Sequence, residues 1–359
     1  MTKLNENIRV NRNLLLFSGT SGRKIKYLKF IFIVLTLIPL ICGGCKPKIA
    51  DSVSVYSRTL HLGHLAPAGT AYDILAHKIS EYVEARSDGR YKILVYPAGA
   101  LGYNQMLIES MIAGTVDMAI VTASDMSNYA RALEVQDLPF LFSDWDEVFK
   151  FLKSDFINEL YALTEPAGIC TLAFMPRGFR HATNNKGPIT KPSDFEDMKL
   201  RVLGNMIYID TFTALGAVLE PMPWEQVYAA INEGKVEGQE NTIATIKDYK
   251  IYEVQKYLSK TGHFFAFAAV TASPVLFSAL PAEDRELLRR AIVDAALDVG
   301  AEQYADEEAA AEILKDNGML VNEIPDKQPF VEKMNSVYEK FFLNHDRRYF
   351  DGIKNAIKK

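Results

Sequence analysis

The chain has 359 residues, of which 48% are hydrophobic and 24% charged, and its formal net charge at pH 7 is −5. This composition is typical of a globular protein and differs from that of disordered or membrane-spanning chains. The length predicts about two domains. The acidic balance argues against nucleic acid as a partner, because binding to phosphates needs an excess of Lys and Arg.

The N-terminal region has the features of an export signal. Several basic residues precede an apolar run at residues 30–42, which is shorter than the roughly 20 residues of a membrane-spanning helix. Gly43-Gly44-Cys45 follows and resembles a bacterial lipobox, although Cys42 stands where Leu is usual. We predict a signal peptide at residues 1–44, cleavage before Cys45 and lipidation of Cys45, with simple cleavage as the alternative.

Removal of residues 1–44 would leave 33 Lys and Arg against 44 Asp and Glu, a net charge of −11. The mature chain would hold only Cys45 and Cys170, so no intramolecular disulfide could form if Cys45 is acylated. The C-x-x-C pattern of Cys42 to Cys45 ends an export signal and does not open a helix, which argues against redox chemistry.

From Thr59 onward short apolar strands alternate with amphipathic helices, a pattern typical of βαβ units and parallel sheets. The expected strands of a first set are residues 60–64, 91–95 and 116–121, and its helices are 70–85 and 104–112. A helix at 145–163 and a strand at 169–175 follow.

Pro and Gly residues are crowded between Met175 and Asp194, which excludes a helix and predicts a crossing between two domains. A second set of elements follows, with strands at 199–202, 217–220 and 236–238 and helices at 208–215 and 225–232. A strand at 264–271 is expected to cross back. A long helix is expected from Pro281 to about Lys315, because this stretch is rich in Ala, Glu and Leu.

Six short motifs occur in order along most of the chain from Arg58 to Lys359. They are Gly99-Ala-Leu-Gly102, Arg180-His-Ala-Thr-Asn184, Lys199-Leu-Arg-Val202, Ala214-Leu-Gly-Ala217, Pro221-Met-Pro-Trp224-Glu-Gln-Val-Tyr228 and Gly238-Gln-Glu-Asn241. Together they resemble the solute-binding subunits of tripartite ATP-independent periplasmic (TRAP) transporters.

The resemblance implies an α/β fold of two lobes, of the periplasmic-binding-protein type II-like class, which closes like a hinge and has a long helix spanning both lobes. The expected lobe I comprises residues 55–177 and 267–306, and lobe II comprises residues 178–266 and 307–359. The domain crossing predicted near Met175 agrees with this division.

The strongest candidate for a ligand contact is Arg201. Strand alternation places Lys199 and Arg201 on one face, at the end of a strand beside the expected cleft. A guanidinium offers two parallel N–H groups that match a carboxylate, and the resemblance implies that Arg201 clamps the carboxylate of the ligand. A solvated strand-end arginine is the alternative.

The resemblance adds further candidates. It implies that Arg180 is a second ligand-binding arginine, that Asn241 contacts the ligand and that Trp224 lines the cleft, with ordinary surface, turn or packing roles as alternatives. We also expect Asn205, and the residues after the first-lobe strands, Tyr103, Thr122 and His64, to face the cleft. Some relatives carry a charged side chain at the place of Thr122 or Asp125, so their particular ligands do not transfer to this chain.

His61 and His64 lie three residues apart in a predicted strand, so their side chains point to opposite faces and no metal site is expected. We expect no cofactor. The chain has no H-E-x-x-H, G-x-S-x-G or P-loop pattern, which counts modestly against an enzyme.

The sequence thus predicts a monomeric, periplasmic or extracytoplasmic solute-binding protein, anchored to the membrane through Cys45. It would capture a small organic acid, such as a sugar acid, a uronate or a C4-dicarboxylate, and deliver it to the small and large membrane subunits of a TRAP transporter. The alternatives are a ligand sensor for a membrane receptor and an extracytoplasmic enzyme that uses the same cleft.

Overall fold

The computed structural model describes residues 58–358. The predicted signal peptide and Cys45 lie outside these residues. None of the helices in the described part combines the length and the apolar character that crossing a membrane requires. The strands form one mixed sheet in the order β2-β1-β3-β8-β4-β7-β5-β6, with β9 paired to β8.

The first half of the sheet is the predicted β-α-β-α-β unit. It consists of β1 (Arg58–His64), α1 (Ala71–Arg86), β2 (Tyr91–Tyr96), α2 (Asn104–Ile112) and β3 (Met118–Thr122), followed by the short α3 (Ala123–Met126). Strand β1 pairs in parallel with both β2 and β3. The expected parallel arrangement is therefore confirmed.

The helix expected at 145–163 is two helices, α4 (Trp145–Leu152) and α5 (Ile157–Ala162). Asp144 caps the start of α4 by accepting a hydrogen bond from the Glu147 backbone N–H at 2.9 Å. The Ser154 hydroxyl donates to the Phe151 carbonyl at 2.7 Å. The Phe151 carbonyl lies in the last turn of α4, and the Ser154 side chain supplies a hydrogen bond to it where the helix ends.

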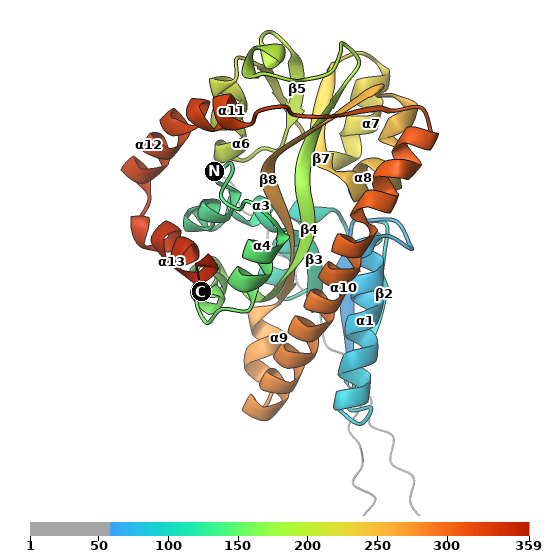
Figure 1. Cartoon of the computed structure of the whole chain (residues 1–359). Coiled ribbons are helices and arrows are strands. Elements are labelled where there is room, and N and C mark those ends of the chain that lie inside the picture. Colours follow the sequence, from blue (N-terminus) through green and yellow to red (C-terminus); the bar gives the residue numbers. More distant parts are fainter. Residues whose placement is uncertain (1–57, 359) are drawn as a thin grey trace, which may run out of the picture. The chain divides into compact units, whose positions relative to one another are not determined.

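Two long antiparallel strands, β4 (Cys170–Asn184) and β8 (Tyr257–Ala272), connect the two halves of the sheet (Figure 1). The sequence predicted only parts of them, 169–175 and 264–271, and the first part stopped just before Pro176 and Gly178. The pairing with β8 shifts register between these two residues. A β-bulge therefore accommodates them within a continuous strand.

The second half of the sheet has three parallel strands and their helices. The elements are β5 (Lys199–Val202), α6 (Met206–Ala214), β6 (Val218–Pro221), α7 (Val227–Asn232), β7 (Gly238–Thr242) and α8 (Ile243–Asp248). Strand β5 pairs in parallel with β6 and β7. Strand β7 begins at Gly238, where the expected strand ended, and a Cβ atom there would lie 2.6 Å from the Thr183 carbonyl oxygen.

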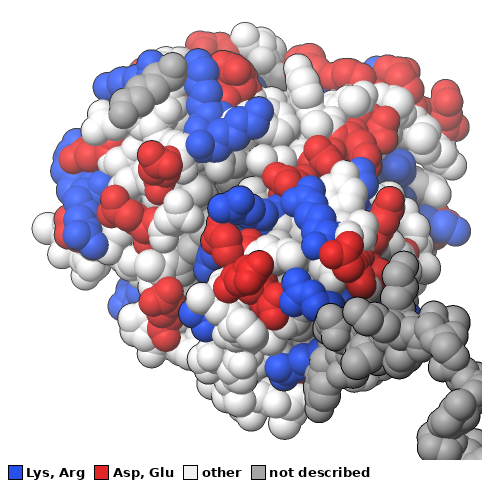
Figure 2. Space-filling model, turned by 90° about the horizontal axis from the view of Figure 1, so that it is seen from below, with Lys and Arg blue, Asp and Glu red and all other residues white. Residues whose placement is uncertain are grey.

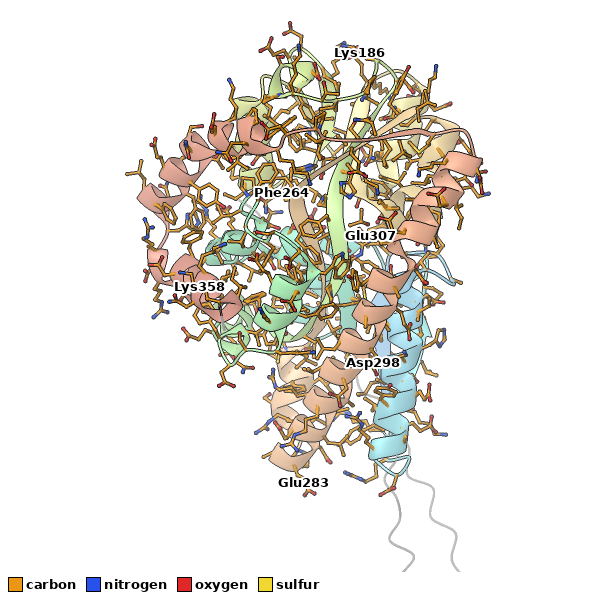
Figure 3. All side chains as sticks on the ribbon, viewed as in Figure 1. Lys186, Phe264, Glu283, Asp298, Glu307 and Lys358 are labelled. Atoms are coloured by element: carbon orange, nitrogen blue, oxygen red, sulfur yellow. The ribbon has the colours of Figure 1, made fainter. Side chains whose placement is uncertain are left out.

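The long helix α10 (Ala282–Asp316) has nearly the predicted bounds and packs along both α1 and β4 (Figure 1). It follows α9 (Pro274–Ala279). At Gly300 the helix approaches β4 so closely that a Cβ atom would lie 2.3 Å from the Pro176 ring. Figure 3 shows Glu307 of α10 beside β4, where its carboxylate accepts a hydrogen bond from the Trp145 indole at 2.8 Å.

After α10 come β9 (Leu320–Glu323), α11 (Gln328–Lys333), α12 (Asn335–Asn344) and α13 (Arg347–Ile357). Helix α12 contacts α6 in the second half of the sheet, whereas α13 contacts α4 beside the first half. The Lys354 ammonium group also donates to the Leu141 carbonyl at 3.0 Å. The C-terminal segment therefore contacts elements of both halves.

On the face shown in Figure 2, Lys and Arg side chains are interspersed with Asp and Glu. Proteins that bind nucleic acid through phosphates gather Lys and Arg on one face or along one helix. On this face Lys and Arg are instead mixed with Asp and Glu.

Candidate ligand-binding site

A cavity of about 610 Å³ lies where the two halves of the sheet meet the crossing strand β4. Its wall includes Thr122 at the end of β3, Asn241 near the end of β7 and Leu203 just after β5. Carboxyl ends of parallel strands are a common position for ligand sites in α/β proteins. Of the eight predicted ligand contacts, six line this cavity: Arg180, Arg201, Asn241, Trp224, Tyr103 and Thr122.

Arg201 is fully buried in β5 and lines the cavity. Its Nε and Nη2 atoms donate to the Met222 carbonyl at 3.0 and 2.7 Å, and its Nη1 atom has no hydrogen-bond partner in the described chain. The guanidinium carbon lies 5.4 Å from the centre of the Trp224 ring. One edge of the guanidinium is therefore fixed, while the edge that carries Nη1 can receive a carboxylate.

Electrostatics favour an anion beside Arg201. Burial lowers the pKa of Arg201 to about 10, and the nearby positive charge of Arg180 adds to this fall, whereas Glu240 and Asp125 oppose it. Among residues 58–358, Arg201 forms no ion pair with Asp or Glu. A buried cation without a paired anion is unfavourable, so an anionic ligand would supply the missing partner.

Arg180 is engaged within the protein. Its Nε and Nη2 atoms donate to the two carboxylate oxygens of Glu240 at 2.6 and 2.7 Å, and its Nη1 donates to Asn241 Oδ1 at 3.2 Å. Burial acts to raise the pKa of Glu240, but the charge and hydrogen bonds of Arg180 prevail and hold that pKa at about 2. Asn241 Oδ1 also accepts from the Thr242 N–H at 2.9 Å, which leaves the Asn241 amide Nδ2 as its group for a ligand.

The cavity wall also carries Asn104, at the start of α2, which was not among the predicted contacts. Asn104 Nδ2 donates to Asp125 Oδ2 at 2.6 Å and to Thr122 Oγ1 at 3.0 Å, whereas the buried Asn104 Oδ1 has no partner in the described chain. Burial raises the pKa of the Asp125 carboxyl. Asn104 Oδ1 can therefore accept a hydrogen bond from a ligand hydroxyl. Tyr103 beside it is 42% exposed and forms part of the rim.

Two predicted contacts do not line the cavity, which corrects the expectation that they face the cleft. His64 is 1% exposed and its Nε2 lies 3.4 Å from Asp73 Oδ1 on α1. Asn205 caps α6, since its Oδ1 accepts from the Ile207 N–H at 2.8 Å, and its Nδ2 donates to Asp137 Oδ2 at 3.0 Å. The His64 ring thus lies against Asp73, although its two nitrogens have no hydrogen-bond partner in the described chain, whereas Asp137 holds the Asn205 amide.

A third arginine, Arg177, lines the cavity and was not among the predicted contacts. Its Nη2 donates to Thr245 Oγ1 at 2.6 Å, and its guanidinium carbon lies 4.7 Å from the centre of the Tyr72 ring. The sequence feature that could have identified Arg177 was its position in the predicted domain crossing, three residues before Arg180.

Comparisons with known proteins agree with this architecture. The family model for bacterial extracellular solute-binding proteins of family 7 matches residues 62–345. A solute-binding protein of Verminephrobacter eiseniae is 31% identical over 292 residues, which cover 80% of this chain and 85% of that protein.

Two solved structures share the fold. A TRAP periplasmic solute-binding protein from Bordetella, with density interpreted as pantoate, superposes with a TM-score of 0.80 at 30% identity, covering 84% of this chain and 99% of the other. One from Polaromonas bound to D-erythronate gives a TM-score of 0.79 at 30% identity, covering 83% and 98%. The expected two-lobed α/β fold and the resemblance to TRAP solute-binding subunits are confirmed. The chain belongs to family 7 of the bacterial extracellular solute-binding proteins.

Proposed function

We propose that this chain captures a small organic acid in the cavity around Arg201 and delivers it to the membrane subunits of a TRAP transporter. The observation that carries the proposal is Arg201 itself. The guanidinium is completely buried, is oriented by the Met222 carbonyl and has no partner for its Nη1 atom in the described chain. A carboxylate is the group that matches such a donor edge.

The relatives support this class of ligand. The Polaromonas structure holds D-erythronate, and the density in the Bordetella structure is interpreted as pantoate. Each of these compounds has a carboxylate and hydroxyl groups. In this chain Arg201 provides the site for the carboxylate, and Asn104 Oδ1 provides an unpaired acceptor for a hydroxyl. Sugar acids, uronates and C4-dicarboxylates all fit this description.

We propose that binding closes two lobes, lobe I with residues 55–177 and 267–306 and lobe II with residues 178–266 and 307–359. The cavity wall contains residues of both lobes, for example Thr122 from the first and Asn241 from the second. A ligand that contacts both lobes stabilises the closed state. The continuous strands β4 and β8 join the lobes, and bending in them would provide the hinge.

We also propose that the chain is a monomer that is exported, cleaved before Cys45 and lipidated there, and that it acts as a binding protein and not as an enzyme. The Gly43-Gly44-Cys45 sequence after an apolar run supports export. A single acyl chain binds membranes weakly, so stable attachment requires more than one. Mass spectrometry of the mature N-terminus tests this, since an unmodified Cys45 would reject lipidation.

A thermal-shift screen of organic acids tests the proposed function. A ligand that binds only the folded state raises the melting temperature by mass action. We expect at least one carboxylic acid with hydroxyl groups to raise it, and uncharged sugars of similar size to have no effect. Tight binding of an uncharged sugar together with no response to any organic acid would reject the proposal.

A further inference from the structure

The main-chain geometry at Arg177 sets it apart from the other residues of its strand. Pro176 pairs with Phe267 of β8, and Gly178 pairs with the adjacent Ala266, so Arg177 is the extra residue of the β-bulge. Gly178 adopts a φ of +113°, a backbone conformation that residues other than glycine rarely adopt. Bulges commonly redirect a side chain beside a functional site, and here the side chain of Arg177 lines the cavity.

The groups that hydrogen-bond to Arg177 orient it but are uncharged hydroxyls, and Arg177 also lines a small second pocket with Asp306 and Glu307. Its hydrogen-bond partners are the Thr245 hydroxyl at 2.6 Å and, more weakly, the Tyr72 hydroxyl at 3.4 Å. Asp248, a carboxylate of the same cavity, pairs with Lys247 at 3.3 Å. Within residues 58–358 Arg177 forms no ion pair with Asp or Glu. This differs from Arg180, whose charge Glu240 compensates.

Arg177 and Arg201 contribute to the cavity from well-separated places in the sheet. Gly238 of β7 pairs with Leu200 of β5 on one side and with Asn184 of β4 on the other. Arg201 is therefore level with the C-terminal end of β4, whereas the backbone of Arg177 lies about six residues back along that strand. The two side chains therefore enter the same cavity from different places along the sheet.

We infer that the cavity selects an elongated acid with a second anionic group, a carboxylate or a phosphate, at the end opposite the first carboxylate. This inference rests on the proposed function and adds a specificity-determining residue to it. Arg201 binds the first carboxylate, and Arg177, oriented by Thr245 and Tyr72, binds the second anion. A monoanionic acid of the same length leaves Arg177 without a charged partner, so it binds more weakly.

Matched acids test the inference in the purified mature chain by isothermal titration calorimetry. Gluconate, glucarate and 6-phosphogluconate share a six-carbon polyhydroxy chain and differ at the end opposite C1. Hexanoate and adipate form a second pair without hydroxyl groups. We expect the wild type to bind the dianion of at least one set at least about tenfold more tightly than its monoanion, equivalent to about 1.4 kcal/mol. A response to adipate or glucarate identifies a second carboxylate, and one to 6-phosphogluconate identifies a phosphate.

The Arg177→Gln variant should lose this preference, with its affinity for the dianion falling at least about tenfold and its affinity for the monoanion changing less than about threefold. Arg177→Lys should keep part of the preference, because the charge remains without the planar guanidinium. Lys235→Gln changes the net charge equally at an exposed residue that pairs with Glu233, and the preference should remain. Circular dichroism spectra of all variants should match the wild type.

The outcomes separate this inference from the proposed function. Equal affinities for monoanions and dianions, or a loss in Arg177→Gln that is the same for both, would overturn the inference and leave acid binding intact. In that case the role of Arg177 would be structural, through its hydrogen bonds to Tyr72 and Thr245. Absence of binding by every acid would overturn the proposed function together with the inference.

Discussion

Arg180 and Glu240 form a bidentate ion pair, with N···O distances of 2.6 and 2.7 Å, and both side chains are almost completely buried. His263 Nε2 lies 3.2 Å from the same carboxylate. The pair links β4 to β7, and Arg180 also donates a hydrogen bond to Asn241, the residue after Glu240. This arrangement holds the Asn241 amide in place and keeps the charge of Arg180 balanced, so Arg201 remains the unbalanced charge at this end of the cavity.

Glu240→Gln should therefore destabilise the fold. The substitution leaves the buried Arg180 without an anion, and breaking a buried pair in this way costs about 3–5 kcal/mol. Urea unfolding followed by circular dichroism measures the change. Replacing both partners, as Arg180→Met with Glu240→Met, should cost less than Glu240→Gln alone, because no unpaired charge remains. A loss below about 1 kcal/mol for Glu240→Gln would contradict the importance of this pair.

The sequence was informative where local pattern decides structure. The alternation of apolar residues gave the strands and helices of both βαβ sets, and the position of Arg201 followed from strand alternation and a short motif. The full length of β4 was not predictable, because Pro176 and Gly178 are unfavourable inside a strand unless a bulge accommodates them. The same bulge determines that Arg177 lines the cavity.

Contacts between distant residues explain the remaining differences in the site. His64 and Asn205 both follow or end strands, as ligand contacts often do, but each side chain lies against a buried partner outside the cavity lining. These partners are Asp73 for His64 and Asp137 for Asn205. Asn104 was missed for the converse reason, since its amide nitrogen is used by Asp125 while its oxygen stays unpaired beside the cavity. No local pattern encodes which polar groups find partners.

Stability should depend on pH through Asp137. Burial raises the pKa of Asp137 to about 7, although hydrogen bonds from Ser124 and Asn205 oppose the rise. The folded state thus binds this proton more tightly than the unfolded state, whose Asp pKa is about 3.9. Stability contributed by Asp137 is present below pH 4 and is lost as the pH rises to about 7, by up to about 1.4 kcal/mol per pH unit.

Asp137→Asn isolates this contribution, because other carboxyl groups titrate in both proteins. We expect the difference in unfolding free energy between variant and wild type to change between pH 4 and 7 in favour of the variant. Urea titrations at four pH values measure it. A constant difference across this range would show that Asp137 does not carry a raised pKa in the folded state.

Gly238→Ala should destabilise the start of β7. The added Cβ atom would lie 2.6 Å from the Thr183 carbonyl oxygen and 3.2 Å from Asn184 Cβ, so the backbone must move, at a cost of about 1–3 kcal/mol. Gly187→Ala is a matched control, since nothing lies within 4 Å of its Cβ position. We expect it to change stability by less than about 0.5 kcal/mol. Equal effects of the two substitutions in thermal unfolding would refute the close approach.

Arg201→Ala should abolish tight binding of the acid identified by the screen while leaving the fold intact. Losing one partner of a buried charge pair costs roughly 2–5 kcal/mol, and 1.4 kcal/mol is about tenfold in affinity, so binding should weaken by about 30-fold to several thousand-fold. Calorimetry measures the affinity, and an unchanged circular dichroism spectrum shows that the fold is retained.

Arg201→Lys is the sharper test of geometry. In the wild type the Nε and Nη2 atoms hold the Met222 carbonyl while the Nη1 edge remains available. A single ammonium group cannot keep that contact and also present two parallel donors to a carboxylate. Arg201→Lys should therefore recover only part of the affinity that Arg201→Ala loses. If Arg201→Ala binds within about twofold of the wild type, Arg201 does not hold the carboxylate, and Arg180 or Arg177 becomes the better candidate.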